Sequence, residues 1–222
     1  MASLRPKYIT FDCYGTLTFF EMSQISRRMF ADRLQGADLD RFVVDFSAYR
    51  RDEVLGAWKP YDQVIKTALM RACKRWGMDY NEAEGQALYD DVPNWGPHAD
   101  VPAPLAKVAE EYPLVILSNA SNSQIQSNVD KLGAPFHAVY TAEQAEAYKP
   151  RFQAFEYMFD QLGCGPDDIL HVSSSLLYDL IPAHDLRISN KAYINRGYDF
   201  STSDYGYHEM SDLSGLPALV GL

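Results

Sequence analysis

The chain has 222 residues, of which 47% are hydrophobic and 23% charged, a composition typical of a folded globular protein and not of a disordered one. Thirty Asp and Glu residues against twenty Lys and Arg residues give a formal net charge of −10, so nucleic acid and acidic membrane surfaces are poor partners for the whole molecule. The three cysteines form no CxxC pair and no apolar run is long enough to span a membrane, so we expect a cytoplasmic protein without a disulfide framework or zinc site.

Short apolar runs rich in β-branched and aromatic residues predict five buried strands. Helical patterns separate them, with short connections. This alternation predicts an α/β fold, a Rossmann-like doubly wound parallel sheet with helices on both faces. The strands are expected at residues 8–11, 114–117, 138–140, 169–172 and 192–194, and the helices at residues 103–112, 123–132, 151–162 and 177–184.

The segment from residue 21 to residue 95 interrupts this alternation. It contains no convincing strand, and stretches such as residues 63–73 place apolar side chains at helical spacing. A loop rich in Pro and Gly then returns the chain to the sheet. We therefore predict a core domain of residues 1–20 and 96–222 and a helical domain of residues 21–95. The tail from residue 201 is expected to cover the sheet edge as a strand or a helix.

Polar residues follow four of these segments, where strands or their connecting loops end. In a doubly wound sheet, ligands bind beyond the carboxyl ends of the strands. Taken singly, an Asp after a strand is usually a turn or helix cap, and a Lys before a Pro is usually a solvated charge. Four such clusters in sequence order at one edge favour an active site instead. The clusters are Asp12 to Thr16, Ser118-Asn119, Lys149-Pro150, and Ser173 to Ser175 with Asp179.

These clusters resemble the motifs of the haloacid dehalogenase superfamily. Phe11-Asp12-Cys13-Tyr14-Gly15-Thr16-Leu17 is similar to its first motif and Leu117-Ser118-Asn119-Ala120 to its second. Tyr148-Lys149-Pro150 is similar to the third motif, and His171 to Asp179 to the fourth. The helical insertion lies where this family carries its cap domain, and the resemblance extends to the 2-haloacid dehalogenase group. It implies a cofactor-free hydrolase that displaces a C2 substituent from a small carboxylic acid and gives a 2-hydroxy acid.

Asp12 is the nucleophile that the resemblance implies. A carboxylate can attack carbon and divide one difficult displacement into two easier steps. In this family it forms an ester that water then hydrolyses. Lys149 is expected to keep Asp12 ionised through a charge-assisted hydrogen bond. Thr16 and Ser118 are expected to hydrogen-bond Asp12 or the substrate carboxylate.

The expected substrate contacts come from both domains. Asn119 is expected to line the site from which the leaving group departs, and Phe20 to form a wall of the pocket. Arg50 matches a cap segment of the dehalogenases, which assigns its guanidinium to the substrate carboxylate or the leaving group; a solvated helix face is the alternative. Tyr14 stands where superfamily phosphatases carry a second Asp. A phenol, with an unperturbed pKa of about 10, is a poor proton donor, and a halide needs none.

The fourth motif departs from the family's pattern. Dehalogenases carry Ser-Ser-Asn there, with an Asp three residues later, whereas here Ser175 replaces the Asn and Asp179 follows it by four residues. Since the family residues position the hydrolytic water, Ser175 and Asp179 are expected to take that role. Phe155 replaces a tyrosine that helps to hold the substrate in the family. These changes indicate a substrate other than the simplest chloroacids, or slower ester hydrolysis.

Other functions remain open at this point. Opening azetidine-2-carboxylate at C2 uses the same chemistry, with a proton for the ring nitrogen from Tyr14 or water. A Mg-dependent phosphatase, with Asp12 and Asp179 as metal ligands, is the alternative enzyme, although the missing second Asp argues against it. A non-catalytic binding protein is a third hypothesis, because a fold does not fix a function. The His and Cys spacing predicts no metal site, and the Tyr-rich tail makes a homodimer contact possible.

Overall fold

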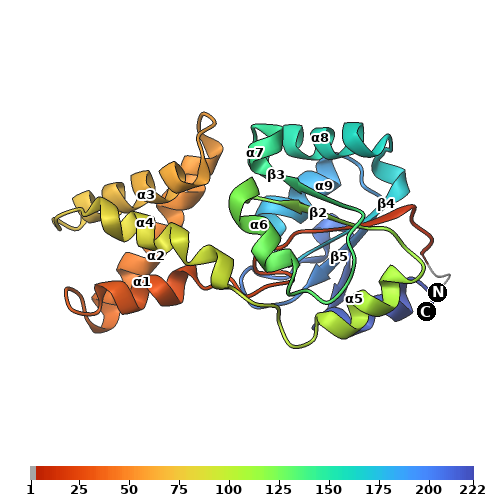
Figure 1. Ribbon diagram of the computed structural model, residues 1–222, viewed down its shortest axis with the longest axis horizontal. Helices are drawn as coiled ribbons and strands as arrows, with labels where there is room; N and C mark the ends of the chain where they lie inside the picture. The colour runs from red at the N-terminus through yellow and green to blue at the C-terminus, as the bar shows by residue number, and fades with distance from the viewer. Residues whose placement is uncertain (1–3) are drawn as a thin grey trace. The chain divides into compact units, whose positions relative to one another are not determined.

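The computed structural model of the protein describes residues 4–222 (Figure 1). Contacts within the chain divide it into two compact units. One comprises the chain up to Phe19 together with Gly96–Leu222, and the other comprises Phe20–Trp95. Within the described residues, no helix is both long and apolar enough to cross a membrane.

The first unit is built on a six-stranded sheet in which all neighbouring strands are parallel. Its order is β3-β2-β1-β4-β5-β6, so the chain moves outward from β1 first in one direction and then in the other. The carboxyl ends of β1, β2 and β4 therefore lie side by side at the point where the strand order reverses. The strands are β1 (Tyr8–Phe11), β2 (Leu114–Ser118), β3 (Ala138–Thr141), β4 (Ile169–Ser173), β5 (Asn190–Ile194) and β6 (His208–Met210).

Helices cover both faces of this sheet, which confirms the predicted fold class. Alternate residues of β2 belong to different apolar clusters: Leu114 and Ile116 to one, Val115 and Leu117 to the other. In Figure 1, α5 and α8 lie on opposite sides of the sheet. The first cluster packs under α5 (Pro102–Ala109), α6 (Asn122–Val129) and α10 (Leu216–Leu219), and the second under α8 (Phe152–Leu162) and α9 (Ile181–Asp185).

The connections of the sheet contain two short helical elements. A capping box between Thr141 and Gln144 begins the single turn α7 (Ala142–Ala145). Residues 177–184 were expected to form one helix; instead a π-helical turn, η3 (Leu176–Leu180), precedes α9.

The tail contributes both a strand and a helix, since β6 extends the sheet beside β5 and α10 packs against the first apolar cluster.

The second unit is helical. All of residues 20–95 are described and none of them lies in a strand. Aromatic packing joins α1 to α2, where the ring centroids of Phe30 and Phe42 are 4.5 Å apart. The Asn81 side chain accepts from the backbone N–H of Ala83 and so caps the last of the long helices. The helices are α1 (Met22–Phe30), α2 (Gly36–Leu55), α3 (Tyr61–Arg75) and α4 (Glu82–Asp90), followed by a 3₁₀ turn at Val92–Asn94.

Candidate active site

Asp12 lies directly after β1 and is only 7% exposed. The chain turns back at once: Gly15 adopts a φ of 92°, and the N–H groups of Leu17 and Thr18 both donate to the carbonyl of Cys13. This turn brings Thr16 back toward Asp12, so that its hydroxyl donates to Asp12 Oδ2 at 2.8 Å. One carboxylate oxygen is therefore held by a neighbour only four residues along the chain.

Lys149 holds the other oxygen. It is 1% exposed, and its ammonium group has three hydrogens to donate. Its Nζ lies 2.9 Å from Asp12 Oδ1, 2.6 Å from Asp179 Oδ1 and 2.8 Å from the carbonyl oxygen of Leu117. Burial alone would lower the pKa of Lys149, but the charges of the two carboxylates outweigh it and raise that pKa. Lys149 is thus a permanent cation shared by two acids.

The two carboxylates respond differently to this shared cation. Burial raises the pKa of Asp12, and the negative charge of Asp179 adds to that effect against the pull of Lys149. Burial also acts on Asp179, but there Lys149 and a hydrogen bond from His171 prevail and lower its pKa. Asp12 is therefore the more basic of the two acids, while Asp179 is held as an anion.

Asp179 is fully buried and its oxygens accept three hydrogen bonds. Lys149 and His171 Nε2 donate to Oδ1, and Ser173 Oγ donates to Oδ2 at 3.0 Å. The π-helical turn η3 explains how it reaches this position despite the extra residue in the motif. The N–H of Leu180 donates to the carbonyl of Ser175, a bond that spans five residues and accommodates one more residue than an α-helical turn.

The serines of the fourth motif divide between two tasks that the sequence did not separate. The N–H of Ser174 donates to Thr16 Oγ1 at 2.8 Å, so Ser174, which the prediction omitted, supports the nucleophile loop. Ser175 was expected beside the hydrolytic water, but its hydroxyl donates to Asp199 Oδ2 at 3.0 Å and accepts from the N–H of Tyr178. Asp199 also accepts from the N–H of Leu176, so it fixes the start of η3. No motif signalled Asp199.

The second motif supplies an amide that binds the Lys149 backbone and a buried hydroxyl without a hydrogen-bond partner in the described chain. Asn119 Nδ2 donates to the Lys149 carbonyl at 2.9 Å and its Oδ1 accepts from the Lys149 N–H at 2.8 Å, so this amide positions the lysine backbone. Ser118 is 1% exposed, and its Oγ has no hydrogen-bond partner among residues 4–222. A buried hydroxyl without a partner is costly in a native structure, which suggests that a polar ligand atom completes it.

Cys13 and Tyr14 follow the nucleophile in the chain. The Tyr14 hydroxyl donates to Asn128 Oδ1 on α6 at 3.1 Å. Burial and the neighbouring charge of Asp12 raise the pKa of the Cys13 thiol, so it stays protonated and unreactive. This agrees with a packing role for Cys13.

A bidentate ion pair fixes the nucleophile loop from outside the motifs. Both Nη atoms of Arg196 donate to the carboxylate of Asp100, at 2.7 and 2.8 Å, and Nη2 also donates to the carbonyl of Thr16. The N–H of Leu213 donates to the same carboxylate. Although burial acts against it, the hydrogen bond from Arg196 lowers the pKa of Asp100 to about 2. No pattern in the sequence indicated this pair.

Arg50 and Phe20 both belong to the helical unit. Arg50 is 9% exposed on α2, with its guanidinium carbon 5.1 Å from the Phe20 ring centroid and 5.3 Å from that of Phe46. Its guanidinium bonds with the neutral hydroxyls of Ser47 and Tyr61, and its Nε has no hydrogen-bond partner among the described residues. The alternative of a solvated helix face therefore does not describe this side chain, whereas Arg51 beside it is exposed.

A divalent cation does not fit between Asp12 and Asp179. The ammonium of Lys149 already contacts an oxygen of each, and the second oxygen of each accepts a hydroxyl hydrogen. Across residues 4–222, no group of three or more His, Cys, Asp or Glu side chains is placed to hold a metal ion. The donor set thus favours chemistry by the protein's own charges.

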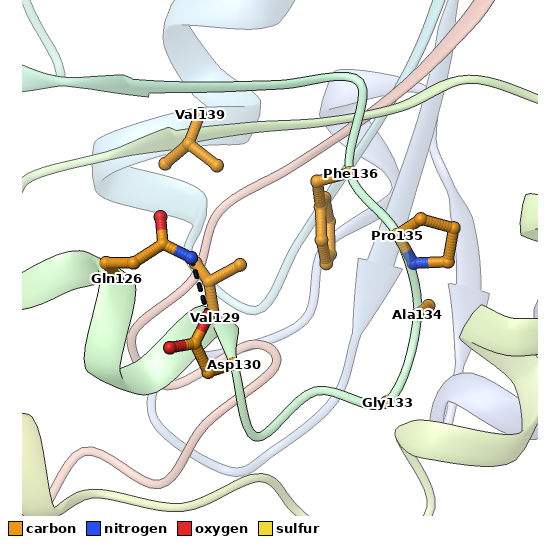
Figure 2. A pocket seen from close by; sticks show the side chains of 8 residues that line it. All are labelled: Gln126, Val129, Asp130, Gly133, Ala134, Pro135, Phe136 and Val139. Carbon is orange, nitrogen blue, oxygen red and sulfur yellow. Dashed lines mark hydrogen bonds between the residues drawn. The ribbon is translucent and has the colours of Figure 1, made fainter.

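A separate surface pocket of about 440 Å³ lies away from these residues (Figure 2). It is formed by α6 and by the loop that precedes β3, at the amino end of that strand. Gln126 Nε2 donates to Asp130 Oδ1 at 2.6 Å on its rim. None of the predicted site residues lines it. Its lining comprises Gln126, Val129, Asp130, Gly133, Ala134, Pro135, Phe136 and Val139.

Comparison with known proteins matches the chain to one family. A family model described as haloacid dehalogenase-like hydrolase matches residues 6–186. The (S)-2-haloacid dehalogenase 2 of Pseudomonas sp. (strain CBS-3) is 27% identical over 175 residues, which is 75% of each chain.

Solved structures share the fold over nearly the whole length. The L-2-haloacid dehalogenase of Xanthobacter autotrophicus with chloropropionic acid covalently bound superposes with a TM-score of 0.78 at 19% identity, covering 97% of this chain and 98% of that one. The HAD-hydrolase YfnB of Bacillus subtilis bound to magnesium gives a TM-score of 0.82 at 16% identity, covering 99% of this chain and 100% of that one. At these identities the likeness shows the fold alone.

Proposed function

The chain belongs to the haloacid dehalogenase-like hydrolases, and from that premise we propose that it displaces halide from C2 of a small carboxylic acid through an ester on Asp12. The observation that carries this proposal is the setting of Asp12. One oxygen of its buried carboxylate accepts from the Lys149 ammonium and the other from the Thr16 hydroxyl. The product would be a 2-hydroxy acid.

In the first step, a carboxylate oxygen of Asp12 attacks C2 of the substrate. The new C–O bond forms as the carbon–halogen bond breaks, and the halide leaves with the bonding electrons, so no proton is required. Lys149 favours the ionised form of Asp12 that this attack needs. Thr16 and Lys149 also fix the orientation of the carboxylate, which reduces the entropy lost on reaching the transition state.

In the second step, water attacks the carbonyl carbon of the Asp12 ester. Negative charge then develops on an oxygen that neighbours the Lys149 ammonium, and a fixed cation stabilises such a charge without reorganising. The bond between that carbon and the ester oxygen breaks, which releases the 2-hydroxy acid and regenerates Asp12, with one proton released to solvent. Asp179 has both oxygens occupied and contributes here through Lys149.

The substrate carboxylate needs donors, and Ser118 offers a buried hydroxyl that has no partner in the described chain. Arg50 belongs to the helical unit, and the resemblance of its cap segment assigns its guanidinium to the substrate carboxylate or the leaving group. The side chain is buried, and its Nε has no hydrogen-bond partner among the described residues. The likeness to (S)-2-haloacid dehalogenase 2 supports an (S)-2-haloacid as the first substrate to test.

Ring opening of azetidine-2-carboxylate is the less favoured reaction. Its nitrogen would have to be protonated on leaving, and Tyr14, the proton donor expected from the sequence, donates its hydrogen to Asn128. A halide departs as a stable anion and makes no such demand.

The experiment uses single turnovers with enzyme in excess over (S)-2-chloropropionate in water enriched in oxygen-18. An ester on Asp12 predicts that chloride is released no later than lactate, that the lactate is unlabelled, and that the label enters the peptide containing Asp12. Label in the first-turnover lactate would refute the ester. Parallel assays for 4-amino-2-hydroxybutyrate from azetidine-2-carboxylate, and for Mg-dependent hydrolysis of p-nitrophenyl phosphate, test the two alternatives. Asp12→Asn is expected to be inactive in every assay.

A further inference from the structure

His171 is a fully buried histidine on β4 for which neither reaction step above has a use. Strand register places it between Thr10 on β1 and Lys191 on β5, so the three side chains share one face of the sheet. Lys191 Nζ donates to the carbonyl of Ile188. Thr10, by contrast, lies within hydrogen-bond distance of the imidazole.

The contacts of the ring nitrogens define one tautomer. His171 Nδ1 lies 2.8 Å from Thr10 Oγ1, and Nε2 lies 3.0 Å from Asp179 Oδ1. The Thr10 hydroxyl has a single hydrogen, and its other acceptor, the Leu170 carbonyl, is 3.5 Å away, at the limit for a hydrogen bond. The hydroxyl therefore donates to Nδ1, which leaves the ring hydrogen on Nε2, facing Asp179.

The ring is also fixed in orientation. The Phe155 ring meets the imidazole edge to face, with centroids 5.4 Å apart and planes at 71°. Both ring nitrogens are occupied and no face is exposed to solvent. The apolar Phe155 ring therefore packs against the histidine that contacts the Asp179 carboxylate.

We propose that His171 is a positioning residue of the reaction: as its Nε2–H tautomer, selected by Thr10, it anchors the Asp179 carboxylate and thereby keeps the Lys149 ammonium against Asp12. This inference rests on the proposed function. Two carboxylates compete for one ammonium, and the contact of Lys149 with Asp179 is already shorter, at 2.6 Å, than its contact with Asp12, at 2.9 Å. A donor on Asp179 that is independent of Lys149 weakens that competition.

Removing the His171 donor should move the Lys149 ammonium from Asp12 toward Asp179. With His171→Leu, Asp179 Oδ1 keeps only Lys149, so the ammonium is drawn away from the nucleophile. Because no atom of His171 touches the reacting groups, we expect kcat to fall by about tenfold while KM stays within about twofold. His171→Gln retains a donor at the position of Nε2 and should recover most of kcat. Thr10→Val, which removes the tautomer selection, should lower kcat by about threefold.

Matched controls use His208, an exposed residue on the outermost strand β6. His208→Leu and His208→Gln should leave kcat and KM unchanged. If His171→Leu does not fold, as judged by circular dichroism, the Gln and Val variants carry the kinetic test. Equal kcat for folded His171→Leu and the wild type would overturn the proposal, as would a loss in His171→Gln as large as in His171→Leu.

Nitrogen-15 NMR of histidine-labelled protein tests the tautomer without any turnover. We expect an Nε2–H tautomer for His171, assigned by its absence in His171→Gln, and a loss of that preference in Thr10→Val. An Nδ1–H tautomer or a doubly protonated ring would overturn the proposal. Failure of the proposed function is distinguishable, because it would appear as no chloride release by the wild type, while the NMR result would still decide the role of Thr10 and His171.

Discussion

Replacing Asp179 by Asn should make Asp12 more acidic. The introduced amide keeps the shape of the carboxylate, with its oxygen facing Lys149 and His171 and its nitrogen facing Ser173, so the variant is expected to fold. The substitution removes the negative charge that raises the pKa of Asp12 and leaves Asp12 as the one anion of this pair that contacts the Lys149 ammonium.

The size of this effect follows from the shared ammonium. Because Nζ lies 2.9 Å from Asp12 Oδ1 and 2.6 Å from Asp179 Oδ1, these two oxygens are at most about 5.5 Å apart. With an effective dielectric constant of about 20, two unit charges at that distance repel by about 3 kcal/mol. Removing the charge of Asp179 lowers the pKa of Asp12, so the acid limb of the rate profile should move to lower pH in Asp179→Asn.

The assay is the pH dependence of the first chloride released when enzyme is in excess, so that slow ester hydrolysis does not obscure the alkylation step. That limb reports the ionisation of the nucleophile in the free enzyme when substrate is below saturation. Asp185→Asn, an exposed carboxylate at the end of α9, is the matched control and should leave the limb in place. An acid limb in Asp179→Asn that stays in place or moves to higher pH would refute the electrostatic reasoning.

Three further predictions concern stability and substrate binding. Because the pKa of Asp100 is lowered to about 2, its stabilising contribution of roughly 2 kcal/mol should be complete above pH 4 and lost as the pH falls toward 2. Asp100→Asn should therefore lower the melting temperature at pH 6 and show a smaller further loss on acidification than the wild type. Equal acid sensitivity of variant and wild type would contradict the ion pair with Arg196. Arg50→Ala should raise KM for a 2-haloacid by about 10- to 100-fold, whereas Arg51→Ala should not, and equal KM values for both variants would remove Arg50 from substrate binding. Ser118→Ala removes a buried hydroxyl that has no partner among residues 4–222, so we expect thermal stability unchanged or higher but KM raised by about tenfold. A clear loss of stability would show that the hydroxyl is satisfied in the folded chain.

The sequence predicted the architecture well because the central strands of the sheet are buried on both faces. Each residue of β2 is buried, and its residues 114–117 form a continuous apolar run that stands out from the amphipathic helices beside it. β6 carried no such signal. Its sequence, His-Glu-Met, is polar and largely exposed, and its place is decided by backbone pairing with β5 at the sheet edge.

The site was predictable where motif chemistry is local and not where contacts are distant in sequence. Asp12 and Thr16 belong to one motif and share one turn, and the Thr16 hydroxyl donates to Asp12, one of the two partners that the resemblance implied. Asp199 and Arg196 follow β5 and reach the site only because the sheet places β5 beside β4. Asn119 was expected at the leaving group, but its amide binds the main chain of Lys149, a contact that spans 30 residues.

The π-helical turn at Leu176–Leu180 allows the fourth motif to be one residue longer in sequence while its acid still contacts the lysine. The hydrogen bond from the N–H of Leu180 to the carbonyl of Ser175 accommodates an inserted residue within one turn, so Asp179, which lies in that turn, still reaches Lys149. A search pattern with a fixed gap between the last serine and the acid would overlook this chain and any relative with the same bulge. Deleting one residue from the turn would restore the three-residue spacing of the family's fourth motif. Activity in such a variant would show that the two spacings can be exchanged without changes elsewhere in the active site.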